Sequence, residues 1–176
     1  MRRILTNSHG FVKLHIAEFF ASVSGLVDSV VALDDGSTDR TRELLEAEPL
    51  AKVLLTNPRR DGFRGWDDAE NRNRLLAAAS ELGPRWILSL DADERIPPDD
   101  RQALAHFIRH EADPTCAYFC RVFALAPRAA TYYGDSLWVG RLFGYQPGVE
   151  RRLSPACAVG AALFIAGMGL AGFARF

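Results

Sequence analysis

A chain of 176 residues, of which 48% are hydrophobic and 24% charged, has the composition of one globular domain. Its formal net charge of −1 argues against a strongly basic, nucleic-acid-binding surface, so no nucleic-acid partner is expected. The three cysteines form no zinc-type set. Together with the absence of a secretory leader, they favour a cytoplasmic location.

The first part of the chain predicts a strand, a helix and a second strand. The short stretch 4–6 is a candidate strand, and 14–26 has apolar residues at helical spacing. Val30–Leu33 is a short apolar run that predicts a buried strand. The run ends on Asp34 and Asp35, so both carboxylates are expected at the carboxyl end of a strand, where open α/β sheets hold their ligands.

A turn and a helix are predicted to follow that strand. Gly36 permits the turn, because glycine adopts backbone conformations that other residues avoid. Residues 40–46 have helical spacing, with Ser37 or Thr38 as the predicted N-cap. The alternative interpretation is an ordinary strand-to-helix turn that is merely rich in capping residues.

The middle of the chain predicts a third strand at 53–55, an arginine-rich loop at 57–66 and a helix over 67–82. Guanidinium groups match the geometry of phosphate, so the loop is a candidate clamp for a diphosphate. A solvated surface loop is the alternative, since charged loops are usually just hydrated.

A second acidic cluster is the most informative feature. The apolar run Trp86–Leu90 predicts a buried strand, and it ends on three carboxylates, Asp91, Asp93 and Glu94. In an extended chain Asp91 and Asp93 face the same way, which suits one divalent cation held between protein carboxylates and a phosphorylated substrate. The alternative is that Asp93 or Glu94 starts a helix without any metal. For Glu94 we expect a structural role, behind the cation ligands or paired with Arg95.

Beyond this cluster the pattern predicts a helix from Pro97 to Ile108 and strands at 118–123 and 138–145. Residues 156–174 then carry no charge. A helix of that length would reach ~28 Å, nearly the hydrocarbon thickness of a bilayer. Its glycines make insertion marginal, so three interpretations stay open: a membrane anchor, a segment packed on the domain, or a non-native end.

Three motifs in this order resemble those of the family 2 glycosyltransferases, which have the GT-A fold. They are Asp34–Asp39, Arg72-Asn73 and Trp86–Glu94, and the resemblance covers roughly residues 15–150. It implies an α/β domain over residues 1–150, a three-layer α/β/α nucleotide-binding domain with a central, mostly parallel sheet. The apolar tail 151–176 lies outside it.

The resemblance also assigns roles to single residues. It implies that Asp34 and Asp35 lie at the base and ribose of a nucleotide-sugar, with Asp35 the better candidate for the base. Arg72 would lie near the nucleotide and Asp91 near the ribose. Asp93 would ligate Mn²⁺ or Mg²⁺ on the diphosphate, with Asp91 as the candidate second ligand. The Asn-Glu pair that the family has after its first strand is missing here.

The acceptor side is less complete. Inverting transfer needs a general base for the acceptor hydroxyl, and no motif here matches the family's base. Asp135 and Glu150 are the only late carboxylates, and neither is predicted to be the base, so the catalytic residue stays unassigned. Tyr132, Tyr133 and Trp138 fall where the resemblance expects rings that line sugars; core packing is the alternative.

The sequence therefore predicts a metal-dependent, inverting glycosyltransferase that moves a sugar from a nucleotide-diphosphate donor to a cell-envelope glycan or lipid-linked acceptor. If the tail is an anchor, the enzyme would work at the inner face of the plasma membrane. Two alternatives stay open: a nucleotide-sugar-binding fragment without turnover, because the chain is C-terminally truncated, and a metal-dependent hydrolase or nucleotidyltransferase.

Overall fold

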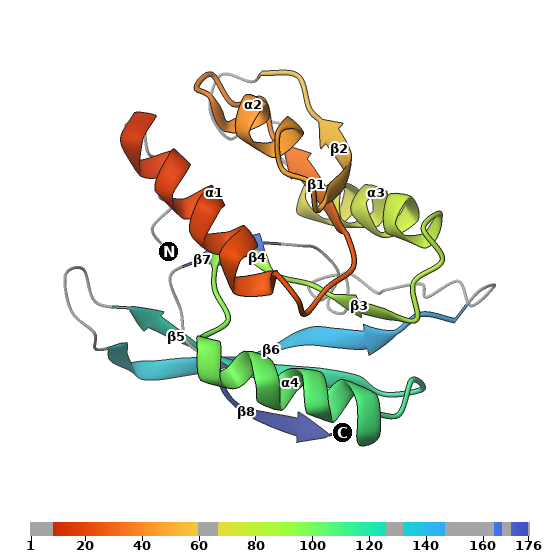
Figure 1. Cartoon of the computed structure of the whole chain (residues 1–176). Helices are drawn as coiled ribbons and strands as arrows, with labels where there is room; N and C mark the ends of the chain where they lie inside the picture. Colours follow the sequence, from red (N-terminus) through yellow and green to blue (C-terminus); the bar gives the residue numbers. More distant parts are fainter. Residues whose placement is uncertain (1–8, 60–66, 126–131, 147–163, 167–169, 176) are drawn as a thin grey trace.

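The computed structural model describes residues 9–59, 67–125, 132–146, 164–166 and 170–175. The predicted strand at 4–6 and most of the arginine-rich loop lie outside these residues. The elements in chain order are α1 (His9–Val23), β1 (Val30–Asp34), α2 (Thr41–Glu46), β2 (Ala51–Thr56), α3 (Asp68–Ser80), β3 (Trp86–Leu88), β4 (Asp91–Glu94), α4 (Pro98–His110), β5 (Ala117–Leu125), β6 (Tyr132–Gly144), β7 (Phe164–Ala166) and β8 (Leu170–Arg175) (Figure 1).

Strands β1 and β2 form a parallel pair with helices on both faces. Successive side chains of a strand point to opposite faces. Val31 therefore packs with Leu75 of α3 in one apolar cluster. Its neighbour Val30 lies in a different cluster with Phe19 and Phe20 of α1. This alternation produces a local helix–sheet–helix arrangement, which belongs to the expected α/β class.

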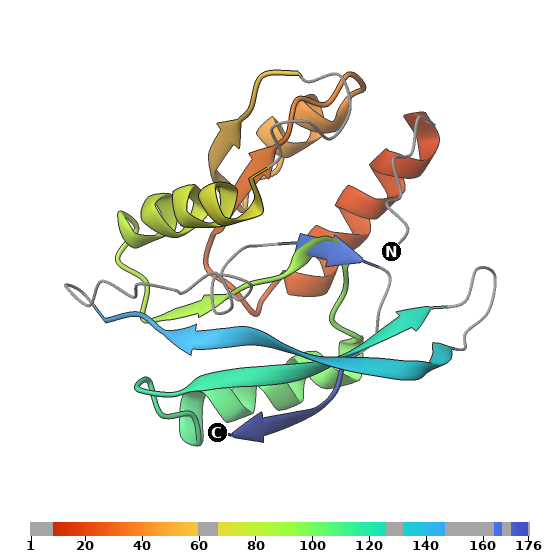
Figure 2. The ribbon, with the colours of Figure 1, turned by 180° about the vertical axis from the view of Figure 1, so that it is seen from behind.

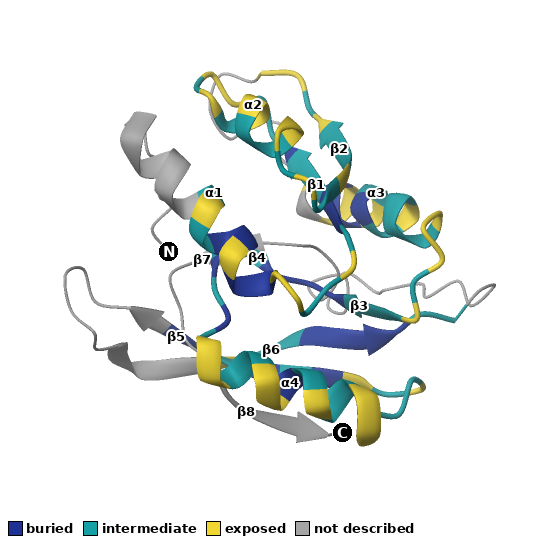
Figure 3. Cartoon of the chain, viewed as in Figure 1, coloured by how far each residue is buried: buried dark blue, intermediate teal, exposed yellow. Residues whose placement is uncertain are grey.

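A second sheet is antiparallel, with the strand order β3-β6-β5-β8. Helix α4 lies across one face of this sheet, as the two opposite views show (Figures 1 and 2). Leu104 of α4 is fully buried, and the ring of Phe107 meets that of Tyr118 on β5 edge-on at a centroid distance of 4.9 Å. The outward side of α4 is exposed (Figure 3).

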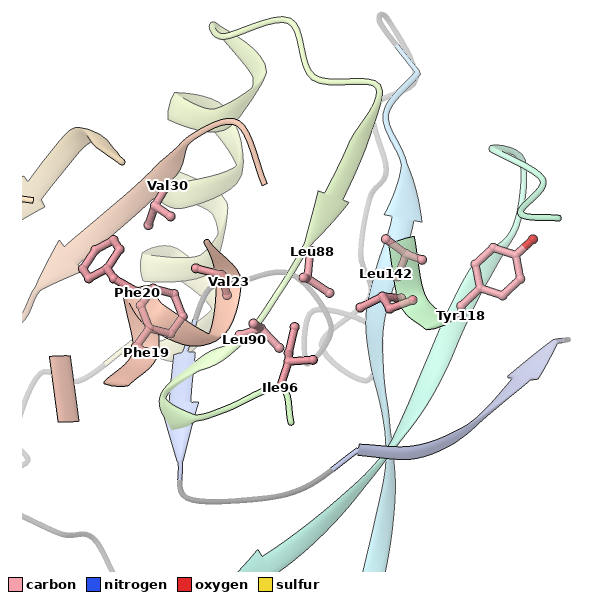
Figure 4. Packing of buried hydrophobic residues seen from close by; sticks show 10 residues of the cluster. Phe19, Phe20, Val23, Val30, Leu88, Leu90, Ile96, Tyr118 and Leu142 are labelled. Carbon is pink, nitrogen blue, oxygen red and sulfur yellow. The ribbon is translucent and has the colours of Figure 1, made fainter. Parts of the chain in front are cut away.

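One hydrophobic core connects the two sheets. Its buried members come from α1, β1, β3, the segments after β3 and after β4, α4, β5 and β6 (Figure 4). Because Leu88 and Leu90 belong to the same cluster as Phe19 of α1 and Leu142 of β6, the chain between β3 and β4 is fixed by packing on both sides. That packing positions the acidic residues that follow.

The strand predicted over 86–90 is two residues shorter in the structure. β3 ends at Leu88, and the acidic residues themselves form β4, which pairs in parallel with β7. The described parts of the tail are thus strands, since β7 pairs with β4 and β8 with β5. These parts do not form the single helix over 156–174 that a membrane anchor would need. Among the described residues, no helix is both long and apolar enough to cross a membrane.

The predicted N-cap of the second helix is wrong. α2 begins at Thr41 with Arg40 at the N-cap position, so neither Ser37 nor Thr38 has that role. The carboxylate of Asp39 instead accepts hydrogen bonds from the backbone N–H and the hydroxyl of Thr41, at 2.9 Å and 2.6 Å. Asp39 therefore satisfies the helix start from one residue farther back in the chain.

Candidate functional site

The first acidic segment is a tight turn at the carboxyl end of β1. Asp34 is buried, and its Oδ1 accepts a hydrogen bond from the backbone N–H of Ser37 at 3.1 Å. Gly36 has a φ of +76°, and a Cβ there would lie 2.8 Å from the Cα of Arg59. The turn thus needs glycine for its conformation and for its close approach to the chain after β2.

Asp35 is held by a side chain that the sequence reasoning did not single out. Asn57, just after β2, donates its side-chain N–H groups to Oδ1 of Asp35 at 2.7 Å and to Oδ1 of Asn71 at 2.9 Å. The guanidinium of Arg74 donates to the Asn57 carbonyl oxygen. Asn57 therefore connects the turn after β1 to two residues of α3.

Helix α3 also reaches the second acidic segment. Arg72 is buried, and its Nη2 lies 3.9 Å from Oδ1 of Asp91. Asn71 and Arg72 are consecutive residues, so one turn of α3 links the group around Asp35 to the group around Asp91. The start of the helix is stabilised by Asp67, its N-cap, whose carboxylate accepts a hydrogen bond from the backbone N–H of Glu70 at 2.9 Å.

A buried arginine from the antiparallel sheet completes the second group. Nη2 of Arg141 on β6 lies 2.6 Å from Oδ2 of Asp91 and also donates to Oε1 of Glu94. Burial opposes the charge on Arg141, but the carboxylates of Glu94 and Asp91 outweigh that effect and raise its pKa. Arg141 is thus a fixed positive charge beneath the acidic segment.

Glu94 is a structural acid, but its predicted partner is wrong. It pairs with Arg141, whereas Arg95 pairs with Glu18 of α1. Oε2 of Glu94 also accepts a hydrogen bond from the backbone N–H of Asp91 at 2.8 Å. Burial raises the pKa of the Glu94 carboxyl to about 8, and the guanidinium of Arg141 opposes this shift.

Asp93 has a different environment from its two acidic neighbours. It is half-buried, and it makes no hydrogen bond or ion pair with another residue of the described part of the chain. Burial, and then the nearby carboxylate of Asp91, raise its pKa to about 6. Neither Asp93 nor Glu94 caps a helix, since α4 begins at Pro98 with Pro97 at the N-cap.

These residues fit a divalent cation that is shared with a ligand. No group of three His, Cys, Asp or Glu side chains within the described ranges would hold a metal by itself. Mg²⁺ in phosphate-binding sites, however, is commonly held by one or two carboxylates plus substrate phosphates. Asp93, whose pKa is raised partly by the charge of Asp91, is a carboxylate that a cation would stabilise. Asp93 would be the main ligand and Asp91 the second.

The polar site is separate from an apolar cavity of about 500 Å³. Val30 and Val31 of β1 line this cavity from one side and Ile87 and Leu88 of β3 from another. Because β1 and β3 belong to different sheets, they do not pair with each other. None of the five predicted site residues lines the cavity. The two acidic segments are joined through α3 instead.

The structure describes only some of the residues that were predicted on the acceptor side. Trp138 on β6 is 49% exposed, so it is not a core residue. Tyr132, Tyr133 and Asp135 lie on the same strand, but their side chains fall outside the described residues. Glu150 lies outside them altogether.

Sequence reasoning missed three residues of the site. Asn57 and Asn71 carry no pattern of their own, although Asn71 stands beside the predicted Arg72. Arg141 had a detectable signal, because it is the one charged residue in the otherwise uncharged run 136–149. A charge in a buried strand needs an opposite charge nearby, and the acidic cluster was the obvious partner.

Comparisons with known proteins identify a family for the chain. The model of the family described as Glycosyl transferase family 2 matches residues 13–159, well over half of the chain. A TPR repeat-containing protein of Synechococcus elongatus is 41% identical over 76 residues. These residues cover 43% of this chain and only 16% of that relative. No solved structure gives a significant match.

Proposed function

Since the chain belongs to glycosyl transferase family 2, whose members have the GT-A fold, we propose that it transfers a sugar from a nucleotide-diphosphate donor to a cell-envelope glycan or lipid-linked acceptor. The observation that carries this proposal is the linkage of the two acidic segments by Asn71 and Arg72 of α3. The contacts of these neighbours bring the segments of Asp35 and Asp91 into one polar site.

Each residue has a proposed role in donor binding. Asp35, oriented by Asn57, accepts a hydrogen bond from the base. Asp34, which holds the turn through Ser37, lies at the base and ribose. Asp91, fixed by Arg141, faces the ribose, and its second oxygen lies near Arg72.

The diphosphate side depends on charge. Asp93, with Asp91 as the second ligand, would hold Mn²⁺ or Mg²⁺, which supplies positive charge to the departing diphosphate. Arg72, like Arg141, adds positive charge close to Asp91. In the transfer, the acceptor oxygen forms a bond to the anomeric carbon while the bond from that carbon to the diphosphate oxygen breaks, with inversion. The hydroxyl proton passes to a general base that is not yet assigned.

Calorimetry with UDP tests this proposal. We expect UDP to bind the chain in the presence of MnCl₂ and to lose measurable binding in EDTA, because unscreened phosphates would be repelled by Asp91 and Asp93. Asp93→Ala should abolish the metal-dependent part of the binding. Asp99→Ala, which removes an exposed carboxylate at the start of α4, is the matched control and should bind like the wild type. Equal affinity in EDTA and MnCl₂ would overturn the proposal.

A further inference from the structure

Arg141 contacts the acidic segment at three points. Its backbone carbonyl accepts a hydrogen bond from the N–H of Ser89 at 2.6 Å, directly after the last register pair of β3 with β6, Leu88 with Leu142. Its guanidinium bonds to Asp91 and to Glu94. One residue of β6 therefore fixes the beginning, the middle and the end of Ser89–Glu94.

The side chain of Glu94, the last residue of this segment, contacts both Arg141 and the beginning of β4. One carboxylate oxygen accepts from Arg141 and the other accepts from the backbone N–H of Asp91. The side chain is buried, with 6% of it exposed, and that of Arg141 is equally buried at 4%. The Arg141 guanidinium and the Glu94 carboxyl group are buried in direct contact, and they have few alternative arrangements, because either group would be costly to bury without its partner.

We propose that Arg141 and Glu94 are positioning residues for the cation. This inference rests on the proposed function. Arg141 bonds to Asp91 and to Glu94, and Asp93 lies between these two residues in the chain. Asp91 is also the proposed second ligand of the cation. Neither Arg141 nor Glu94 needs to touch the cation: they fix the backbone and the Asp91 side chain so that the two aspartates present their oxygens to one ion. Residues of this kind behind metal ligands commonly change metal affinity by ~10–100-fold when substituted.

The variant Arg141→Lys separates geometry from charge. Lysine keeps the positive charge but replaces the planar guanidinium with a single ammonium group, which does not reproduce both contacts. We expect the affinity for Mn²⁺ in the presence of UDP to fall on the order of tenfold or more. The matched control is Arg121→Lys on the neighbouring strand β5, where the guanidinium lies 4.8 Å from the centroid of the Phe123 ring; its Mn²⁺ affinity should not change.

Calorimetry below the melting temperature of every variant distinguishes the outcomes. A purely structural role of Arg141 would lower the melting temperature and leave the Mn²⁺ affinity of the folded protein unchanged, which would overturn the inference. If the wild type binds neither Mn²⁺ nor UDP, the proposed function fails instead. Glu94→Gln has only one acceptor oxygen for two donors, so it should weaken Mn²⁺ binding as well. The double variant should lose less than the sum of the two free-energy changes, because both act through one contact.

A measurement on the unmodified chain covers the case in which these variants do not fold. The backbone N–H of Asp91 should exchange slowly with solvent deuterium before any cation is added, because Glu94 accepts its hydrogen bond. The reference is the exchange rate of an unprotected amide in the same local sequence. Exchange of the Asp91 N–H at the rate of a solvated amide would show that the segment is not closed and would overturn the inference.

Discussion

Asn57 has the most polar connections among the side chains around Asp35. Its amide donates to Asp35 and Asn71, and its carbonyl accepts from Arg74, so one side chain sets the distance between the turn after β1 and α3. A buried or half-buried amide with all these contacts has a defined orientation. At this scale the site is organised by neutral amides around Asp35 and by guanidinium groups around Asp91.

Replacement of Asp35 tests the first of these groups. Asp35→Asn removes the charge that would accept a hydrogen bond from the base, and such a bond is worth ~1.5–3 kcal/mol. We therefore expect UDP affinity to fall by about one to two orders of magnitude, with little change in melting temperature, because Asp35 is only half-buried. Glu43→Gln on α2, where the side chain is 65% exposed, is the control. An unchanged UDP affinity would remove Asp35 from the site.

The raised pKa of Asp93 predicts how Mn²⁺ binding depends on pH. Burial and the Asp91 carboxylate raise its pKa to about 6, and a cation binds the ionised carboxylate in competition with the proton. The affinity for Mn²⁺ should therefore be constant well above pH 6 and decrease by up to about tenfold per pH unit below that pKa. Titrations at several pH values measure this. An affinity that falls only near pH 4, the usual range of an aspartate, would contradict the assignment.

At the scale of the elements, the turn after β1 and the first half of α3 do most of the positioning. The turn carries Asp34 and Asp35, and α3 carries Asn71 and Arg72. Both depend on local features, namely the positive φ of Gly36 and the cap of α3 by Asp67. The site is consequently sensitive to substitutions that touch no ligand.

Gly36→Ala tests this dependence against a matched control. The left-handed conformation alone costs an alanine ~1–2 kcal/mol, and at Gly36 the new Cβ would also overlap with the backbone of Arg59. Gly83 has a φ of +62°, and a Cβ added there would meet no atom within 4 Å, so Gly83→Ala has only the conformational cost. Urea unfolding should show a larger loss of stability for Gly36→Ala, accompanied by weaker UDP binding. Equal losses for the two variants would show that the close approach to Arg59 is unimportant.

The sequence predicted these elements well where one local pattern decides the structure. The apolar run before Asp34, the glycine turn and the helix with Asp67 at its start were all visible in the chain. Prediction from the sequence failed where a contact between residues far apart in the chain decides the local structure. The division of 86–94 into β3 and β4 depends on pairing with β6 and β7, and the partner of Glu94 comes from β6. No spacing within the acidic segment contains that information.

At the scale of the whole molecule, the polar site is built from two sheets that share one hydrophobic core. The β1–β2 pair contributes Asp35 and, through the following chain, Asn57, whereas the antiparallel sheet contributes Arg141. The core cluster joins α1, β1, β5 and β6, which keeps these contributions at fixed distances. The apolar cavity between β1 and β3 belongs to this core region, and the predicted ligand-binding residues do not line it.

The central claim is that one nucleotide-diphosphate site includes both acidic segments, and nuclear magnetic resonance of the full chain tests it most directly. Adding UDP with MgCl₂ should shift the backbone signals of Asp35, Arg72 and the segment 91–94 together, with one common affinity. Replacing Mg²⁺ with a trace of paramagnetic Mn²⁺ should broaden the signals of 91–94 before any others. Shifts confined to residues that line the apolar cavity, such as Leu76 and Ile108, with the acidic segments unchanged, would contradict the account.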